Sequence, residues 1–208
     1  MKVISQSFEN QTVIPGPFAF AIKDPASHIS LSSNHNPHLS WSDYPAKTQS
    51  FAVICHDPDV PSQGDDVNQE GKVVPASLPR VDFYHWVLVN IPANIHSIEA
   101  GSHSSAITPK GKAANASPVG LAGINDYTAW FKGDAEMGGN YFGYDGPCPP
   151  WNDEIKHHYV FTVYALDVAS VALTGAFTGA DALSAIKPHV IDQASITGIY
   201  SLNPKVSL

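Results

Sequence analysis

The sequence contains few of the features that mark several large protein classes. Of 208 residues only Cys55 and Cys148 are cysteines, and 11 basic residues stand against 19 acidic ones, a formal net charge of −8. Two cysteines far apart cannot staple a domain of this size, and a reducing cytosol keeps such thiols free. An acidic chain also lacks the basic surface that nucleic acids and anionic membranes require. We therefore expect free thiols and no nucleic-acid partner.

Long apolar runs and enzyme motifs are missing as well. No stretch reaches the roughly 18 apolar residues of a membrane span, and the first residues lack the basic-then-apolar pattern of a signal peptide. The chain contains no P-loop, no dinucleotide-binding GxGxxG, no HExxH and no GxSxG elbow. These absences predict a cytoplasmic protein with no stable membrane insertion, no cofactor and no enzymatic activity.

The sequence is unusually rich in histidine. The 10 histidines almost equal the 11 lysines and arginines, while charged residues make up only 14% of the chain, against about 25% in an average soluble domain. Glycine and proline, at 15 and 17 residues, stay below the share that marks low-complexity chains. The length fits one globular domain that spans residues 1–208.

Runs rich in β-branched and aromatic residues predict a mainly β fold. The three clearest strands are Phe51 to Asp57, Phe83 to Ile91 and His157 to Asp167. Each has apolar residues at both parities, which indicates central strands covered on both faces. Weaker strand candidates are Ile14 to Ile22 and Leu39 to Trp41.

One helix is predicted near the C-terminus, over residues 179–194, with Thr178 as its N-cap. Pro188 interrupts the pattern, and proline inside a helix removes a backbone hydrogen bond, so we expect a kinked or split helix. The apolar residues that share one face at helical spacing are Ala182, Leu183, Ile186, Val190 and Ile191.

Strand order and side-chain parity place several polar residues together. Asp57 ends the first clear strand, whereas His85 and His157 lie near the starts of the other two. If those two strands run antiparallel to the first, all three residues meet at one edge of the sheet. Parity predicts these shared faces: Asp57 with Val53 and Cys55, His85 with Phe83 and Val87, His157 with Tyr159 and Phe161. The other histidines are expected on the opposite face (His56, His158) or in loops and at the surface (His28, His35, His38, His96, His103, His189).

The gathered residues predict a small anion pocket. Imidazole and phenol groups donate hydrogen bonds to oxyanions, and Asp57 would fix the tautomer of a histidine or raise its pKa. The rigid turn Gly146 to Pro150 lies just before the third strand. Its glycine lets backbone N–H groups approach a ligand. Two simpler interpretations remain open: the histidines are hydrogen-bonded core residues, or the segment DPDVP is only a turn.

Several segments match the sequence motifs of a known family and occur in the same order. They are NPHLSWSDYP (36–45), DPDVP (57–61), HWVLVNIP (85–92), YDGPCPPWND (144–153), HHYVFTVYALD (157–167) and TGIYSL (197–202). On these motifs the chain resembles the phosphatidylethanolamine-binding proteins, within their bacterial and archaeal Raf-kinase-inhibitor-like branch. The resemblance covers most of the chain from residue 36 onward.

The resemblance implies a Greek-key fold in which a large antiparallel central sheet packs on a smaller second sheet, with a C-terminal helix. It also implies a pocket for phosphate-like anions and phospholipid head groups, inhibition of a kinase or a protease, and a homodimer. Carried over position by position, the pocket comprises Asp57, Asp59, Pro61, His85, Gly146, Pro147, His157 and Tyr159.

The chain departs from the family pattern at three positions. His158 stands where the family often has arginine, and Trp151 and Asn152 follow the Pro-Pro pair where a glycine is usual. A tryptophan there would narrow the mouth and exclude a bulky head group, which favours a small anion over a phospholipid.

We therefore predict a non-enzymatic protein that binds a phosphate-like anion, a phosphorylated small molecule or a phosphorylated partner. The first alternative is a metal-dependent hydrolase that uses Asp57, Asp59, His85 and His157, because carboxylates and imidazoles are suitable metal ligands. The second alternative is a structural protein that acts through assembly. The sequence names neither a natural ligand nor a protein target.

Overall fold

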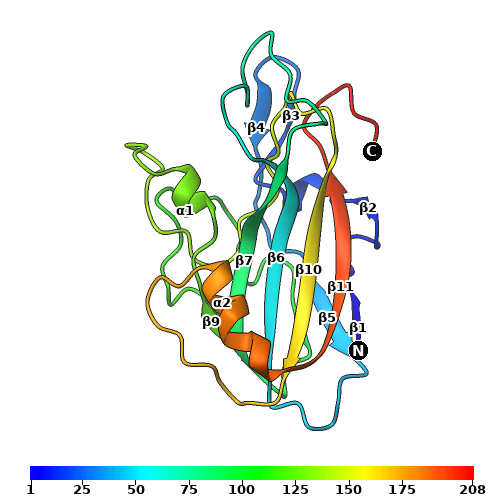
Figure 1. Ribbon diagram of the computed structural model, residues 1–208, viewed down its shortest axis with the longest axis vertical. Helices are drawn as coiled ribbons and strands as arrows, with labels where there is room; N and C mark the ends of the chain where they lie inside the picture. The colour runs from blue at the N-terminus through cyan, green and yellow to red at the C-terminus, as the bar shows by residue number, and fades with distance from the viewer.

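Six strands form the main sheet of the computed structural model, which describes residues 1–208. Their order across the sheet is β2-β11-β10-β6-β7-β9 (Figure 1). The long inner strands pair antiparallel, whereas β2 runs parallel to β11. The sheet is therefore mixed, and the expected antiparallel arrangement holds for every strand pair except β2–β11. The strands are β2 (Thr12–Val13), β6 (Ser50–Pro61), β7 (Arg80–Pro92), β9 (Leu121–Ala122), β10 (His157–Leu166) and β11 (Val190–Tyr200).

Two smaller sheets and two helices complete the fold. The three-stranded sheet has the order β1-β5-β8, and β3 pairs with β4 as a hairpin. In Figure 1 helix α2 lies in front of the large sheet, while β1 and β5 lie behind it. The remaining elements are β1 (Lys2–Ile4), β3 (Ala21–Asp24), β4 (His28–Leu31), β5 (Leu39–Ser42), β8 (Ser97–Ile98), α1 (Tyr127–Trp130), α2 (Gly179–Ile186) and the 3₁₀ turns η1 (Gly16–Phe18) and η2 (Lys187–His189). None of the helices is long and apolar enough to cross a membrane.

Apolar side chains cover both faces of the large sheet. Val53 of β6 packs into the cluster shared with the three-stranded sheet, whereas the next residue, Ile54, packs into the cluster under α2. The same division occurs on β7 between Trp86 and Val87, and on β10 between Phe161 and Leu166. The inference that these strands are central, drawn from apolar residues at both parities, is confirmed. The predicted mainly β fold, with a smaller second sheet and a C-terminal helix, is confirmed as well.

The structure corrects two sequence predictions of local structure. Residues 14–22 do not form a strand, because Pro15-Gly16-Pro17 leads into the 3₁₀ turn η1 and β3 begins only at Ala21. The helix begins where Thr178 caps it, with the side chains of Thr178 and Asp181 each bonding the other's backbone N–H. It ends at Ile186, however, and Pro188 lies in the short turn η2. From Val190 onward the chain is strand β11, so the predicted helix is wrong over residues 187–194.

Candidate functional site

A bulge on β7 determines where His85 points. In the register with β6, Cys55 pairs with Trp86 and His56 pairs with Tyr84, so His85 is the extra residue. A bulge of this kind lets two consecutive side chains face the same side of a sheet. Trp86 therefore belongs to the main core while Val87 packs on the α2 side. The expectation that His85 shares a face with Val87 is wrong, although His85 does reach the predicted edge.

Four predicted residues meet at that edge of the sheet. The Nδ1 atom of His157 lies 2.7 Å from the carboxylate of Asp57, and the rings of His85 and Tyr159 stand edge to face with centroids 5.0 Å apart. All four side chains are almost fully enclosed, at 0–3% exposure. The antiparallel order of β6, β7 and β10 produces this meeting, as the sequence predicts.

His85 is held through one ring nitrogen only. Its Nδ1 lies 2.8 Å from the backbone carbonyl of Asp145, and a carbonyl oxygen can only accept, so Nδ1 carries a proton. Its Nε2 makes no hydrogen bond with the protein and is not fully enclosed. Burial lowers the pKa of His85, against smaller opposing effects of Asp57 and Asp145. At neutral pH His85 is therefore an uncharged imidazole with an open lone pair on Nε2.

Tyr159 supplies a hydroxyl group without a partner. Its oxygen is fully enclosed and makes no hydrogen bond within the protein. Burial raises the pKa of Tyr159 well above its ordinary value, and the nearby Asp57 carboxylate raises it further, both by its charge and as a hydrogen-bond acceptor close to the hydroxyl. The phenol thus keeps its proton and can donate a hydrogen bond to an anion.

His157 lies at the centre of a buried chain of ion pairs. Its Nδ1 is 2.7 Å from Asp57 and its Nε2 is 3.2 Å from Asp153, and it is 0% exposed. Burial would lower the pKa of His157, but the hydrogen bonds to Asp153 and Asp57 outweigh it and raise the pKa to about 9. Arg80, the only arginine, contacts Asp153 from the other side. Both nitrogens of His157 are engaged, so this residue supports the site without presenting a donor to a ligand.

Asp59 and Pro61 lie away from His85. The carboxylate of Asp59 accepts hydrogen bonds from the backbone N–H of His158, at 2.8 Å, and from its ring nitrogen, at 2.7 Å. The backbone N–H of Asp59 in turn donates to Asp57 at 2.8 Å. Pro61 pairs with Arg80 at the far end of the β6–β7 hairpin. The backbone of Asp59 therefore helps to hold Asp57, and the Asp59 carboxylate is engaged with His158.

The glycine turn plays a different part from the expected one. The N–H of Gly146 donates to the side-chain oxygen of Asn34 at 2.8 Å, and the carbonyl of Pro147 accepts from the backbone N–H of Phe20 at 2.9 Å. A Cβ on Gly146 would stand 2.3 Å from the carbonyl oxygen of Phe18. The prediction that this N–H is available to a ligand is wrong, because the glycine is needed for close backbone packing.

Sequence reading missed the residues that hold His85 in place. Asp145 is 0% exposed, and its carboxylate accepts from Asn34 at 2.7 Å, Asn125 at 2.8 Å and Lys112 at 2.8 Å. Tyr127 of α1 packs on the His85 ring, with centroids 5.6 Å apart. Only Asp145 lay in a recognised motif, and nothing in the sequence near Lys112 or Tyr127 pointed to these contacts.

Two histidines assigned to the surface are buried instead. His38 is 5% exposed and its Nδ1 accepts the backbone N–H of Gln6 at 3.1 Å. His103 is 8% exposed and packs against Trp86, with ring centroids 5.6 Å apart. Burial lowers the pKa of His103 to about 4. Both side chains belong to the interior, not to the loop or surface positions expected for them.

The residues that depart from the family pattern bind a neighbouring loop. The Trp151 indole stacks on the His28 ring at 3.8 Å, nearly parallel, and its backbone N–H donates to Asn68 at 3.0 Å. The Asn152 side chain accepts from the Asn68 N–H at 2.9 Å and donates to the carbonyl of Asp66 at 2.8 Å. The turn after the Pro-Pro pair therefore holds the segment between β6 and β7 by hydrogen bonds.

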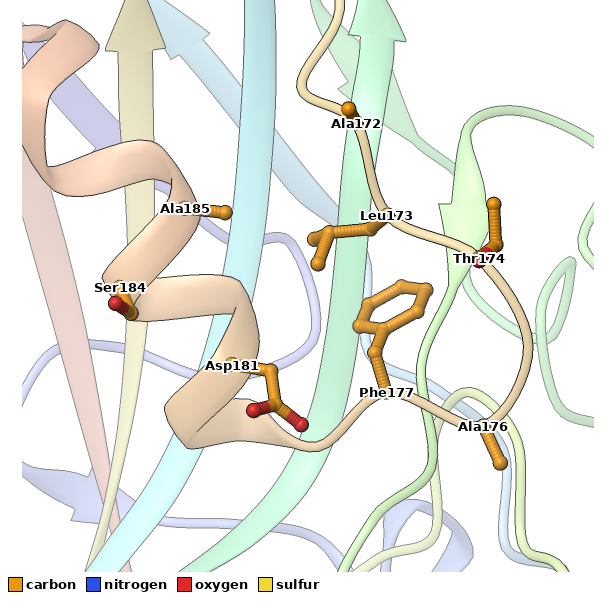
Figure 2. Close-up of a pocket in the computed structure, with 8 residues that line it drawn as sticks. All are labelled: Ala172, Leu173, Thr174, Ala176, Phe177, Asp181, Ser184 and Ala185. Atoms are coloured by element: carbon orange, nitrogen blue, oxygen red, sulfur yellow. The ribbon is translucent and has the colours of Figure 1, made fainter.

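A separate hollow lies beside α2. It measures about 550 Å³ and opens between α2 and the loop before it, where Leu173 and Phe177 face the helix (Figure 2). Its one charged residue, Asp181, already bonds Thr178 in the helix cap. This hollow offers apolar surface and little chemistry, so it does not replace the His85 edge as the candidate site.

The hydrolase alternative finds no support in the geometry. No group of three or more His, Cys, Asp or Glu side chains is placed to hold a metal ion. The carboxylates expected to serve as ligands are engaged instead, Asp57 with His157 and Asp59 with His158. Both cysteines are free thiols, as expected.

Comparisons with known proteins agree with the fold. The chain is 32% identical over 168 residues to the UPF0098 protein YbhB of Escherichia coli, which covers 81% of this chain and 82% of that one. It is 31% identical over 176 residues to a UPF0098 protein of Methanothermobacter thermautotrophicus, covering 85% and 89%. Its structure resembles that of E. coli YbcL, described as a member of the mammalian PEBP family, with a TM-score of 0.68, 24% identity and coverage of 96% and 97%. The family model for phosphatidylethanolamine-binding proteins matches residues 4–201, and the chain therefore belongs to that family.

Proposed function

We propose that this protein is a non-enzymatic binding protein whose His85 edge takes the phosphate group of a small molecule or of a phosphorylated partner. The observation that carries the proposal is the Tyr159 hydroxyl, which is enclosed and unpartnered beside the open Nε2 of His85. A buried polar group without a partner costs about 1–3 kcal/mol. An oxyanion that accepts from this hydroxyl would recover that free energy.

The surroundings of the site support a small ligand. The four gathered side chains are 0–3% exposed, and aromatic rings border His85, with Phe83 at 4.9 Å and Tyr127 at 5.6 Å. Enclosure by aromatic walls favours a small phosphate group over a bulky substituent. A phosphate group, whether free, on a lipid head group or on a protein, is the chemistry that we assign to the site.

Two finer proposals follow from the resemblance. Capture of a phosphorylated segment would let the protein inhibit a kinase or a protease, and a homodimer in the cytoplasm is the form in which we expect it to act. Sedimentation of the purified chain would test the second. For the first, we would look for competition between inorganic phosphate and a phosphopeptide at the same site.

Thermal unfolding with and without inorganic phosphate tests the binding proposal. Phosphate at ten times its dissociation constant should stabilise the fold by about 1.4 kcal/mol, a rise in Tm of roughly 3–6 °C for a chain of this size. Tyr159→Phe keeps the ring and removes the donor, so it should abolish the rise. Tyr44→Phe is the matched control, because Tyr44 bonds His96 in the loop beside the small sheet, and it should respond as the wild type does. An equal rise in Tyr159→Phe would refute the assignment.

A further inference from the structure

The protonation state of His85 restricts which anions the site can take. Its Nδ1–H is committed to the Asp145 carbonyl, so the neutral ring presents a lone pair at Nε2. A fully ionised oxyanion also presents only lone pairs. Two acceptors placed face to face repel each other, whereas a ligand that carries a hydroxyl proton can donate it to Nε2.

The charged groups around His85 provide no free positive charge. On β6 and β10, Asp57 and Asp153 flank the His157 imidazolium, and Arg80 balances Asp153. These four charges sum to zero. From the loop that precedes β10, Asp145 is paired with Lys112 at 2.8 Å.

The remaining titratable groups that face His85 are Tyr159 of β10 and Tyr127 of α1. Burial raises the pKa of both phenols well above the ordinary value, so they stay neutral. The neighbourhood is therefore electrically balanced when His85 is neutral. Charging His85 without a ligand would place an uncompensated cation in an enclosed space, which is unfavourable.

We propose that the site binds an oxyanion together with one proton, as in a phosphomonoester in its singly protonated form. The P–OH group donates to Nε2 of His85, and a second oxygen accepts from the Tyr159 hydroxyl. When the free ligand is fully ionised, binding takes one proton from solvent, and that proton stays on the ligand oxygen that donates to Nε2. This inference rests on the proposed function and narrows it to ligands that carry or acquire a proton.

Inorganic phosphate and sulfate form the probe pair, because they share a shape but only phosphate carries an exchangeable proton near neutral pH. We would measure both dissociation constants by isothermal titration calorimetry at fixed ionic strength. At about pH 7.5 sulfate should bind at least tenfold more weakly than phosphate. From about pH 7.5 to about pH 8.5 the dissociation constant of phosphate should rise severalfold, and the rise should approach the tenfold per pH unit that uptake of one proton requires. The binding enthalpy should also differ between two buffers of different ionisation enthalpy, by the amount that uptake of one proton requires.

A matched pair of variants locates the proton. His85→Gln replaces the imidazole by an amide that donates without titrating, so the pH slope should disappear and the two anions should bind within threefold of each other. His56→Gln makes the same change on the opposite face of the sheet and should keep both the slope and the difference.

Three outcomes would overturn the inference: equal wild-type affinities for the two anions, a pH-independent phosphate affinity, or a slope retained in His85→Gln. Failure of both anions to bind at any pH would instead refute the proposed function. If His85→Gln does not fold, the wild-type anion comparison and proton count decide the question alone.

Discussion

His157 should make the stability of this protein depend on pH through the alkaline range. The pKa of this histidine in the fold is about 9, raised from its ordinary value of 6.5 by its two carboxylate partners. Because the folded state holds the proton more tightly, the stabilisation is complete below about pH 6.5 and is lost as pH rises through about 9. At 1.36 kcal/mol per pKa unit, the difference amounts to about 3 kcal/mol. The residue is 0% exposed, so solvent does not screen this contribution.

The perturbation that isolates it is His157→Gln. At about pH 6.5 the variant leaves Asp57 and Asp153 without their shared cation, which should cost about 3–5 kcal/mol. Near pH 9.5 the wild-type histidine is itself neutral, so the difference between the two proteins should shrink by about 3 kcal/mol. Urea unfolding at about pH 6.5, 8 and 9.5 measures that difference directly, because alkaline effects common to both proteins cancel.

His189→Gln provides the control. His189 also contacts an aspartate, Asp167 at 3.1 Å, but the two side chains are 37% and 44% exposed. Exposed pairs contribute little, so this variant should differ from the wild type by less than about 1 kcal/mol at every pH. A constant difference between wild type and His157→Gln over this range would refute the reasoning. So would an NMR titration that places the His157 pKa near 6.5.

Two further predictions concern the residues that hold the site together. Lys112→Met removes the ammonium group 2.8 Å from the enclosed carboxylate of Asp145 and leaves only amide donors, so urea unfolding should show a loss of about 3 kcal/mol; a loss below about 1 kcal/mol would contradict the buried pairing. Gly146→Ala places a Cβ 2.3 Å from the Phe18 carbonyl oxygen, which forces the turn to shift, and we expect a loss of about 1–3 kcal/mol. An unchanged unfolding midpoint would show that the turn adapts without cost.

The sequence was informative wherever a local pattern decides the structure. Apolar residues at both parities identified β6, β7 and β10, and their antiparallel order was enough to bring Asp57 and His157 together. A bulge has no such signature. The extra residue at His85 changes the parity of everything before it on β7, and so the assignment of Val87 to the same face failed.

Strand β11 was missed because two patterns overlap in one segment. Val190 and Ile191 continue the helical spacing of α2, but they also begin an alternating stretch that pairs along β10. Pro188 decides between the two, since it interrupts the helix and the β-branched residues Val190 and Ile191 follow soon after it. The sequence does not show that Val190 pairs with Leu166 of β10.

The site itself shows why residue type alone could not assign roles. His85 and His157 lie at the same sheet edge, yet they take opposite protonation states. His157 contacts two carboxylates and is charged, whereas His85 contacts one backbone carbonyl and is neutral. The charged imidazole is therefore paired inside the protein, and His85, the histidine that we propose to face a ligand, is uncharged. In a chain with a net charge of −8, an anion recognised at this edge must be held by hydrogen bonds and by a proton that comes with it, because the surrounding charges already cancel.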